Sequence, residues 1–200
     1  MSALPTELRR VIDLLRKLPG VGERTALRYA LTLCQSPADA LSLSKGIAAM
    51  ATTIGRCSTC GNLARMGEAC DICNDSKRDA NTIAVVASVQ HVLAFERTKY
   101  RGRYHVMSAM VNPLEGINAD DIRADLDALA MRLTAGMELI LAFDSSTIGD
   151  ATAMVIAHFF DGSSLTISRI ARGVQANGDI GEADAVTLGQ AVGERRQMEN

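Results

Sequence analysis

The sequence predicts a multi-part α+β protein: an N-terminal helical hairpin, a small module built on four cysteines, an α/β domain with a mostly parallel sheet, and a C-terminal helix. Apolar residues recur at three- and four-residue steps before residue 55, which is typical of amphipathic helices. Four of the five cysteines lie between residues 57 and 73. After residue 80, short apolar strands alternate with helical segments, a pattern that indicates a sheet covered on both faces.

Two helices are predicted at the start of the chain. The first ends where Pro19 and Gly20 interrupt it, and the second covers residues 23–33. The apolar positions of the first are Leu4, Leu8, Val11, Ile12, Leu15 and Leu18, and the inward positions of the second are Ala26, Leu27, Ala30 and Leu31. Cys34, in the same apolar run, is expected to be a buried and inert thiol.

The turn between these helices has the sequence LPGVG, residues 18–22. Gly20 and Gly22 are expected to allow positive φ twice and to leave amide groups uncovered before a helix N-terminus, which suits a phosphate group. Arg24 and Arg28 lie four residues apart on the next helix, so we expect them to face the same nucleic-acid backbone. Such contacts do not depend on base sequence. The alternative is a hairpin that needs glycine only to turn.

A third helix is predicted from Ser36, a capping residue followed by proline, to about residue 54. Its inward residues are expected to be Leu41, Leu43, Ile47, Met50 and Ile54.

Two Cys-x-x-Cys pairs, CSTC and CDIC, follow with nine residues between them. Four thiolates close the tetrahedral shell of Zn²⁺ and leave no open position, so the predicted site is structural. Its ligands are Cys57, Cys60, Cys70 and Cys73. Two disulfides are the alternative, but the opening residues MSALPTEL contain no apolar signal segment, which favours a reducing cytoplasm and a bound metal.

The α/β part is predicted to hold strands at 82–87, 104–107, 137–143 and 164–168, with helices at 88–97, 120–134, 151–160 and 185–196. Ligands of such sheets bind beyond the carboxyl ends of the strands. The residues there are Ala87, Ser108, 144–150 and 169–173.

Several polar residues in this part have two interpretations. Residues 97–104 interleave four positive charges with Tyr100 and Tyr104, which suits base stacking, but a solvated loop and edge strand whose tyrosines pack inward is the favoured explanation. Asp144 and Asp150 could hold a metal, but turn and N-cap roles are sufficient for both. His91, His105 and His158 are expected to be ordinary surface or core residues.

The net charge of −2 hides an asymmetry. Residues 1–80 carry 11 basic and 8 acidic side chains, whereas residues 81–200 carry 10 and 15. This distribution weakly favours an anionic partner at the N-terminal end. No segment reaches the ~18 apolar residues that a membrane span requires, so no membrane partner is expected.

Taken together, LPGVG, the four cysteines, TIAVVA, NPLEGI (112–117), GDATA (149–153) and RIARG (169–173) resemble the RecR family of bacterial recombination mediators. The resemblance implies a helix-hairpin-helix DNA-binding domain at 1–54, a zinc finger at 55–80, a Toprim α/β domain at 81–173 and a C-terminal segment with a helix at 174–200. It assigns DNA binding to Gly20, Gly22, Arg24 and Arg28, and Zn²⁺ binding to Cys57, Cys60, Cys70 and Cys73.

The resemblance also implies a function: a non-enzymatic, cytoplasmic mediator that forms a tetrameric ring or a dimer and acts with RecO and RecF to load RecA at gapped DNA. The chain departs from the family pattern at Ala87, where a glutamate is usual, at Asp144-Ser145-Ser146, where Toprim enzymes have Asp-x-Asp, and at 174–184. One aspartate cannot hold a catalytic Mg²⁺, so catalysis is not expected. The alternatives are a Mg²⁺-dependent nuclease or primase-like enzyme, and an oligomeric protein-interaction module.

Overall fold

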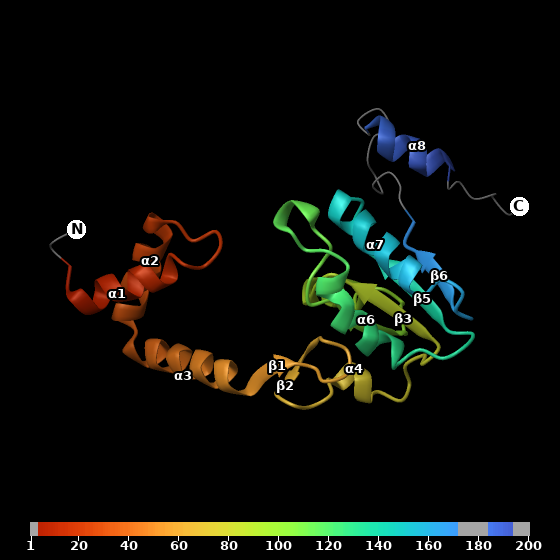
Figure 1. Cartoon of the computed structure of the whole chain (residues 1–200). Coiled ribbons are helices and arrows are strands. Elements are labelled where there is room, and N and C mark those ends of the chain that lie inside the picture. Colours follow the sequence, from red (N-terminus) through yellow and green to blue (C-terminus); the bar gives the residue numbers. More distant parts are fainter. Residues whose placement is uncertain (1–3, 172–183, 194–200) are drawn as a thin grey trace, which may run out of the picture. The chain divides into compact units, whose positions relative to one another are not determined.

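The computed structural model describes residues 4–171 and 184–193 and divides the chain into two compact units, Met1–Ile54 and Gly55–Asn200 (Figure 1). The fold class is confirmed: a helical hairpin, a four-cysteine module, a parallel α/β domain and a C-terminal helix follow one another. None of the described helices is long and apolar enough to cross a bilayer.

The first unit contains α1 (Thr6–Leu15), α2 (Glu23–Gln35) and α3 (Pro37–Thr53). Its core is small: Ile12 of α1 is buried against Ala26 and Ala30 of α2, and Leu8, Leu15 and Leu27 pack around them. The two alanines lie one turn apart, and their small side chains let the two helices approach closely. The expected inward positions of α2 are therefore confirmed for its alanines.

Other burial predictions for this unit are wrong. All five expected inward residues of α3, Leu41, Leu43, Ile47, Met50 and Ile54, are 39% to 61% exposed. Leu31 and Cys34 of α2 are also exposed. Leu43, Ile47 and Met50 share one face of α3, whereas Leu41 lies on the opposite side and Ile54 follows the helix in β1; no described element covers these side chains. Ser36 precedes α3 as predicted, yet its side chain makes no capping hydrogen bond.

The second unit begins with the two-stranded sheet of β1 (Ile54–Arg56) and β2 (Leu63–Arg65), followed by the short helix α4 (Asp71–Asn74). The α/β part then contains β3 (Thr82–Val86), α5 (Val89–Phe95), β4 (Arg103–Val106), the 3₁₀ turns η1 (Pro113–Glu115) and η2 (Asp120–Ile122), α6 (Arg123–Ala130), β5 (Glu138–Ala142), α7 (Thr147–Phe159) and β6 (Thr166–Arg169). Helix α8 (Ala185–Gly193) is the last described element.

The four-stranded sheet has the order β4-β3-β5-β6, and all three pairings are parallel. Because side chains alternate along a strand, β3 contributes Ile83 and Val85 to one face and Ala84 and Val86 to the other. The first face packs against α6 and α7, and the second against α5 (Figure 1). Burial on both faces explains why these strands are continuous apolar runs.

Helix α7 begins at Thr147, four residues before the predicted start. Ser146 caps it, since its hydroxyl accepts a hydrogen bond from the Gly149 amide at 3.0 Å. Asp150 therefore lies inside the helix and does not cap it, which corrects the predicted role. Residues 174–183 and the predicted helical residues after Gly193 lie outside the described residues.

The two tyrosines of residues 97–104 pack inward, as the structural interpretation predicted. Tyr104 is fully buried, and the rings of Tyr100 and Tyr104 meet Phe95 edge-on at centroid distances of 5.5 and 6.1 Å. The Tyr104 hydroxyl donates to Glu96 Oε1 at 2.6 Å, and Arg78 binds both oxygens of the same carboxylate. These residues hold the segment after the cysteines against the sheet and are not open to a base.

Replacing Glu96 by glutamine should lower the free energy of unfolding by about 2 kcal/mol. The Arg78 side chain is only 9% exposed, so losing the Glu96 carboxylate would leave a buried charge with only the longer, half-exposed pair to Asp75 at 3.7 Å. Asp127→Asn is the matched control, because the Arg123–Asp127 pair is exposed and should contribute less than about 1 kcal/mol. Denaturant titrations of the two variants measure the free energy of unfolding. If both variants lose the same amount, the buried Arg78–Glu96 pair contributes no more to stability than the exposed pair.

His105 of β4 is expected to make stability pH-dependent. Burial, and then the nearby Arg132 guanidinium, lowers the pKa of His105 to about 4, and Arg56 acts in the same direction while Asp125 opposes it. Its Nδ1 lies 3.3 Å from Arg132 Nη1, and its buried Nε2 has no partner among the described residues. An unfolded imidazole takes up its proton near pH 6.5, so the unfolded state gains protons first as pH falls.

From pH 7.5 to 5.5 the free energy of unfolding should therefore fall by about 1 kcal/mol through this group alone. Denaturant titrations of the metal-loaded parent and of His105→Gln should show a smaller fall in the variant. His158→Gln is the control, because His158 is exposed on α7. Identical pH profiles for the parent and His105→Gln would rule out this role.

Candidate functional site

The structure brings together the four cysteines predicted as metal ligands. The Sγ atoms of Cys57, Cys60, Cys70 and Cys73 all lie within 4.8 Å of one another. The Sγ–Sγ distance is 3.6 Å for Cys60 and Cys70 and 3.9 Å for Cys57 and Cys73. Four sulfurs at about 2.3 Å from one ion form a tetrahedron with edges of about 3.8 Å. The cluster therefore fits a tetrahedral metal ion, and the cysteines are not joined as disulfides.

Backbone turns place these sulfurs. The Gly61 amide donates to the Cys57 carbonyl at 3.1 Å and closes the first knuckle. The amides of Thr59 and Cys70 both donate to Cys57 Sγ, at 3.4 and 3.2 Å. Helix α4 starts directly after Cys70, so Cys73 follows almost one turn later on the same side. The Cys-x-x-Cys spacing is therefore sufficient to build each half of the cluster.

The electrostatics of the cluster favour a cation. Burial raises the pKa of Cys57, but hydrogen bonds from the backbone of Cys70, Cys60 and Thr59 outweigh it and lower the pKa to about 6. The pKa of Cys60 is raised, first by its hydrogen bond with Cys73 and then by burial, and the pKa of Cys70 is raised by burial and by neighbouring Cys60. Several thiolates cannot share this space unless a positive ion compensates their charge.

The cysteine module is attached to the sheet at the end of β4. The Val106 amide donates to the Cys60 carbonyl at 2.7 Å, and Arg56 Nη2 donates to the Val106 carbonyl at 2.8 Å. Gly61 has a φ of 74°, and a Cβ there would lie 2.6 Å from the Val106 carbonyl oxygen. Only glycine fits at this junction. Loss of the metal would therefore also disturb the edge of the sheet.

The turn before α2 differs from prediction in one respect. Gly20 has a φ of 75°, but Gly22 has a φ of −79°, so only one of the two glycines uses the left-handed region. Gly22 instead precedes α2 as its N-cap, and its carbonyl accepts from the Ala26 amide at 2.9 Å. A Cβ at either glycine would meet nothing within 4 Å, so the turn is open on its outer side.

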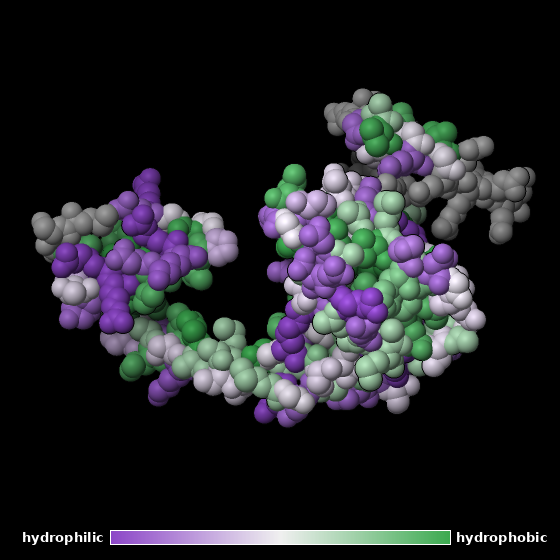
Figure 2. All heavy atoms as spheres, viewed as in Figure 1, coloured by the Kyte–Doolittle hydropathy of each residue, from purple (hydrophilic) through white to green (hydrophobic). Residues whose placement is uncertain are grey.

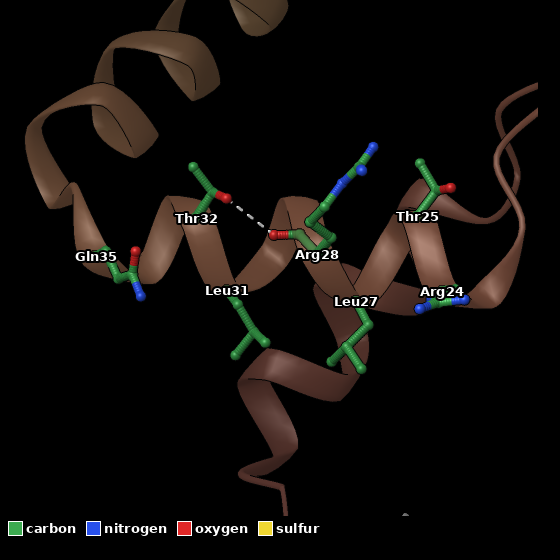
Figure 3. A pocket seen from close by; sticks show the side chains of 7 residues that line it. All are labelled: Arg24, Thr25, Leu27, Arg28, Leu31, Thr32 and Gln35. Carbon is green, nitrogen blue, oxygen red and sulfur yellow. Dashed lines mark hydrogen bonds between the residues drawn. The ribbon is translucent and has the colours of Figure 1, made fainter.

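A hollow of about 660 Å³ lies beside α2, and Arg24 and Arg28 both line it (Figure 3). Figure 3 shows Leu27 and Leu31 pointing to one side of the helix, while Arg28 and Thr32 point to the other. Both arginines are exposed, and among the described residues no carboxylate pairs with either guanidinium. Arg28 also lies 5.5 Å from the ring centre of Tyr29. The two charges are therefore available to an anionic ligand.

Sequence reasoning selected only these two cations, but α1 and the turn after it expose four more: Arg9, Arg10, Arg16 and Lys17. Residues 1–54 carry seven basic and four acidic side chains. Figure 2 shows hydrophilic residues over much of α1 and α2. A count of charges along the first helix would have identified these residues, because they form two adjacent basic pairs, Arg9-Arg10 and Arg16-Lys17.

The carboxyl end of the sheet holds Ala87 and Asp144, the two positions considered above for a catalytic Mg²⁺ site. Ala87 follows β3 and packs against the core, and Asp144 follows β5 and accepts a hydrogen bond from the Ser146 hydroxyl at 2.7 Å. Arg169 of β6 donates to the Asp144 carbonyl at 3.1 Å and pairs with Asp150 at 2.5 Å. Within residues 4–171 and 184–193, the four cysteines are the one group of three or more Cys, His, Asp or Glu that could hold a metal.

Comparison with known proteins gives two family matches. The model described as "RecR, helix-hairpin-helix" matches residues 8–51, and the model described as "Toprim domain" matches residues 81–171. Recombination protein RecR of Streptomyces coelicolor is 40% identical over 193 residues, which cover 94% of this chain and 96% of that protein. The RecR proteins of Thermobifida fusca and Limosilactobacillus fermentum are 39% and 38% identical, and each alignment covers at least 96% of both chains.

Proposed function

This chain belongs to the RecR family of recombination proteins, and from that premise we propose that it is a non-enzymatic, DNA-binding mediator of recombinational repair. The observation that carries the proposal is the exposed pair Arg24 and Arg28 beside an open glycine turn, at the start of a helix. The relatives' shared name supports the role in recombination. The protein acts in the cytoplasm, at the nucleoid.

DNA binds at the hairpin through its phosphates. The amides of the turn at Gly20 and Gly22 and the first amides of α2 attract an anion, because a helix N-terminus carries a partial positive charge. Arg24 and Arg28 extend this contact one turn along the helix. None of these groups can distinguish bases, since they reach the backbone only. The binding is therefore independent of sequence.

The metal held by the four cysteines is Zn²⁺. An all-sulfur tetrahedral set suits this ion, and a shell with four protein ligands leaves no position for a substrate. The metal would hold the finger in shape and, through Cys60 and Val106, fix it to the sheet. It supplies stability rather than catalysis.

The Toprim domain does not break phosphodiester bonds. A Mg²⁺ ion for phosphoryl transfer needs converging carboxylates. Ala87 supplies no carboxylate, and the carboxylate of Asp144 already accepts a hydrogen bond from the Ser146 hydroxyl. The guanidinium of Arg169 already places a positive charge between Asp144 and Asp150. The rival is a Mg²⁺-dependent nuclease or primase-like enzyme. Cleavage or synthesis by purified protein with Mg²⁺, abolished by Asp144→Ala, would establish the rival.

Its protein partners are RecO and RecF, with which it loads RecA at gapped DNA, and it assembles as a ring-like tetramer or a dimer. Three exposed apolar side chains on one face of α3, Leu43, Ile47 and Met50, support self-association, since large exposed apolar faces usually mark interfaces. A protein-interaction module without DNA binding is the remaining alternative.

Titration of gapped and duplex DNA of two unrelated sequences tests the proposal. The affinities for the two sequences should agree within about twofold, and the logarithm of the affinity should fall linearly with the logarithm of salt concentration, by about 0.9 for each duplex phosphate contacted. An oligomer that binds RecO but neither DNA would favour the interaction module. Strong sequence preference would contradict backbone binding.

A further inference from the structure

Tyr29 of α2 differs from the other two tyrosines of the chain. Tyr104 is fully buried, and the Tyr100 hydroxyl donates to the Arg103 carbonyl at 2.9 Å. Tyr29 is 44% exposed, and its hydroxyl makes no hydrogen bond to any residue that the structure describes. Exposed side chains with apolar parts are common at protein surfaces, so the neighbours of the Tyr29 ring decide what it can do.

The ring of Tyr29 is paired with a cation. The Cζ atom of Arg28 lies over this ring, 5.5 Å from its centre. Such a cation–π contact holds the guanidinium and the ring in one mutual arrangement. A guanidinium covers at most one face of a ring, so a planar group can stack on the other face. The pair is therefore partly organised for a ligand that carries both a negative charge and a flat ring.

Helical spacing places Tyr29 at the border of the hollow beside α2. Tyr29 follows Thr25 by four residues and precedes Thr32 by three, so the three side chains share one edge of the helix. Both threonines line the hollow together with Arg24 and Arg28. Figure 3 shows Thr25, Arg28 and Thr32 on the same side of α2. The ring thus lies beside the two arginines that are available to an anion.

A nucleotide with an unpaired base has the two groups that this arrangement suits. Its phosphate can bind the guanidinium of Arg28, and its base can stack on the ring of Tyr29. In uninterrupted duplex DNA the faces of the bases are covered by neighbouring base pairs, and only their edges are open in the grooves. A single strand or a gap exposes the faces. Stacking accepts every base, so it adds no sequence preference.

We infer that Tyr29 stacks on an unpaired base while Arg28 binds a phosphate of the same strand, so that the hairpin prefers DNA with single-stranded segments over uninterrupted duplex. The inference rests on the proposed function and specifies the form of DNA that the site selects. Residues 97–104, the other candidate for base stacking, cannot supply this contact because their tyrosines pack inward.

The first test uses the fluorescence of the protein itself. The chain contains three tyrosines and no tryptophan, so its emission comes from tyrosine. The full chain is titrated with a single-stranded oligothymidylate and with a blunt duplex of the same length. Stacking on a base quenches tyrosine, so the emission should fall with the single strand and change little with the duplex. Tyr29→Leu should abolish the fall, and the one tryptophan of Tyr29→Trp should be quenched by the single strand.

The second test measures dissociation constants for the same two DNAs, labelled, by fluorescence anisotropy. Tyr29→Leu should weaken binding of the single strand at least about fivefold and binding of the duplex less than about twofold. Tyr29→Phe keeps the ring and should bind both DNAs within about twofold of the parent. Leu14→Ala is the matched control, because Leu14 is a 53% exposed residue on α1 of the same unit, and it should bind like the parent.

Four outcomes would overturn the inference. If Tyr29→Leu binds the single strand like the parent, or loses affinity for both DNAs equally, the ring does not select unpaired bases, although phosphate binding by the hairpin stands. If Tyr29→Phe is as weak as Tyr29→Leu, the hydroxyl and not the ring makes the contact. If Tyr29→Leu changes the oligomeric mass measured by light scattering, the ring is a contact between copies of this chain. If the parent binds neither DNA, the proposed function fails as well.

Discussion

Removing the metal, or replacing Cys70 by serine, is expected to unfold the segment around the four cysteines. Cys70 is buried, and its amide and sulfur both take part in the cluster. Structural zinc contributes about 10–16 kcal/mol of apparent binding energy in isolated fingers, which is comparable with the whole stability of a typical domain. Elemental analysis of the parent should give close to one zinc per chain.

Loss of the metal should also destabilise the sheet to which the four-cysteine segment is attached. Cys60 and Arg56 bind the end of β4, so the melting temperature of the second unit should fall together with the finger, and amide exchange should rise at Val106. Cys34→Ser is the control, because Cys34 is exposed on α2 and outside the cluster. A metal-free protein with free thiols, native amide exchange and an unchanged melting temperature would refute the structural role.

The second large effect is expected from Arg24→Ala together with Arg28→Ala. If each arginine neutralises one phosphate, the slope of log affinity against log salt should become shallower by about 2, and affinity for gapped DNA should fall roughly 10- to 100-fold. The loss should be the same for unrelated DNA sequences, since backbone contacts carry no base information. Fluorescence anisotropy at several salt concentrations measures both quantities.

The matched control removes two exposed arginines from the second unit, Arg101→Ala with Arg123→Ala, which changes the net charge equally. If the control weakens DNA binding as much as the hairpin variant, net charge alone governs binding. A hairpin variant that binds gapped and duplex DNA like the parent would contradict the assignment of the site to α2. An unchanged circular-dichroism spectrum and melting temperature of the hairpin variant would show that its fold is intact.

Local patterns were sufficient for much of the architecture. The Cys-x-x-Cys spacing identified a cluster whose sulfurs prove to lie at tetrahedral distances, because each knuckle is built within four residues. Apolar runs such as 82–87 and 137–143 identified β3 and β5, since a strand buried on both faces must be apolar throughout. Helix boundaries were predicted less accurately. Helix α7 starts four residues before its predicted start, because Ser146 and not an aspartate caps it.

The sequence by itself determined the order of the parts, the family and the cluster of four cysteines, because these depend on spacing over a few residues. Only the tertiary structure decided which apolar side chains are covered. Periodicity places Leu43, Ile47 and Met50 on one face of α3, but it cannot show that these side chains, or Leu114, are left exposed. The carboxylate that Arg78 meets and the carbonyl that requires glycine at position 61 lie far along the chain, so only folding brings them into contact.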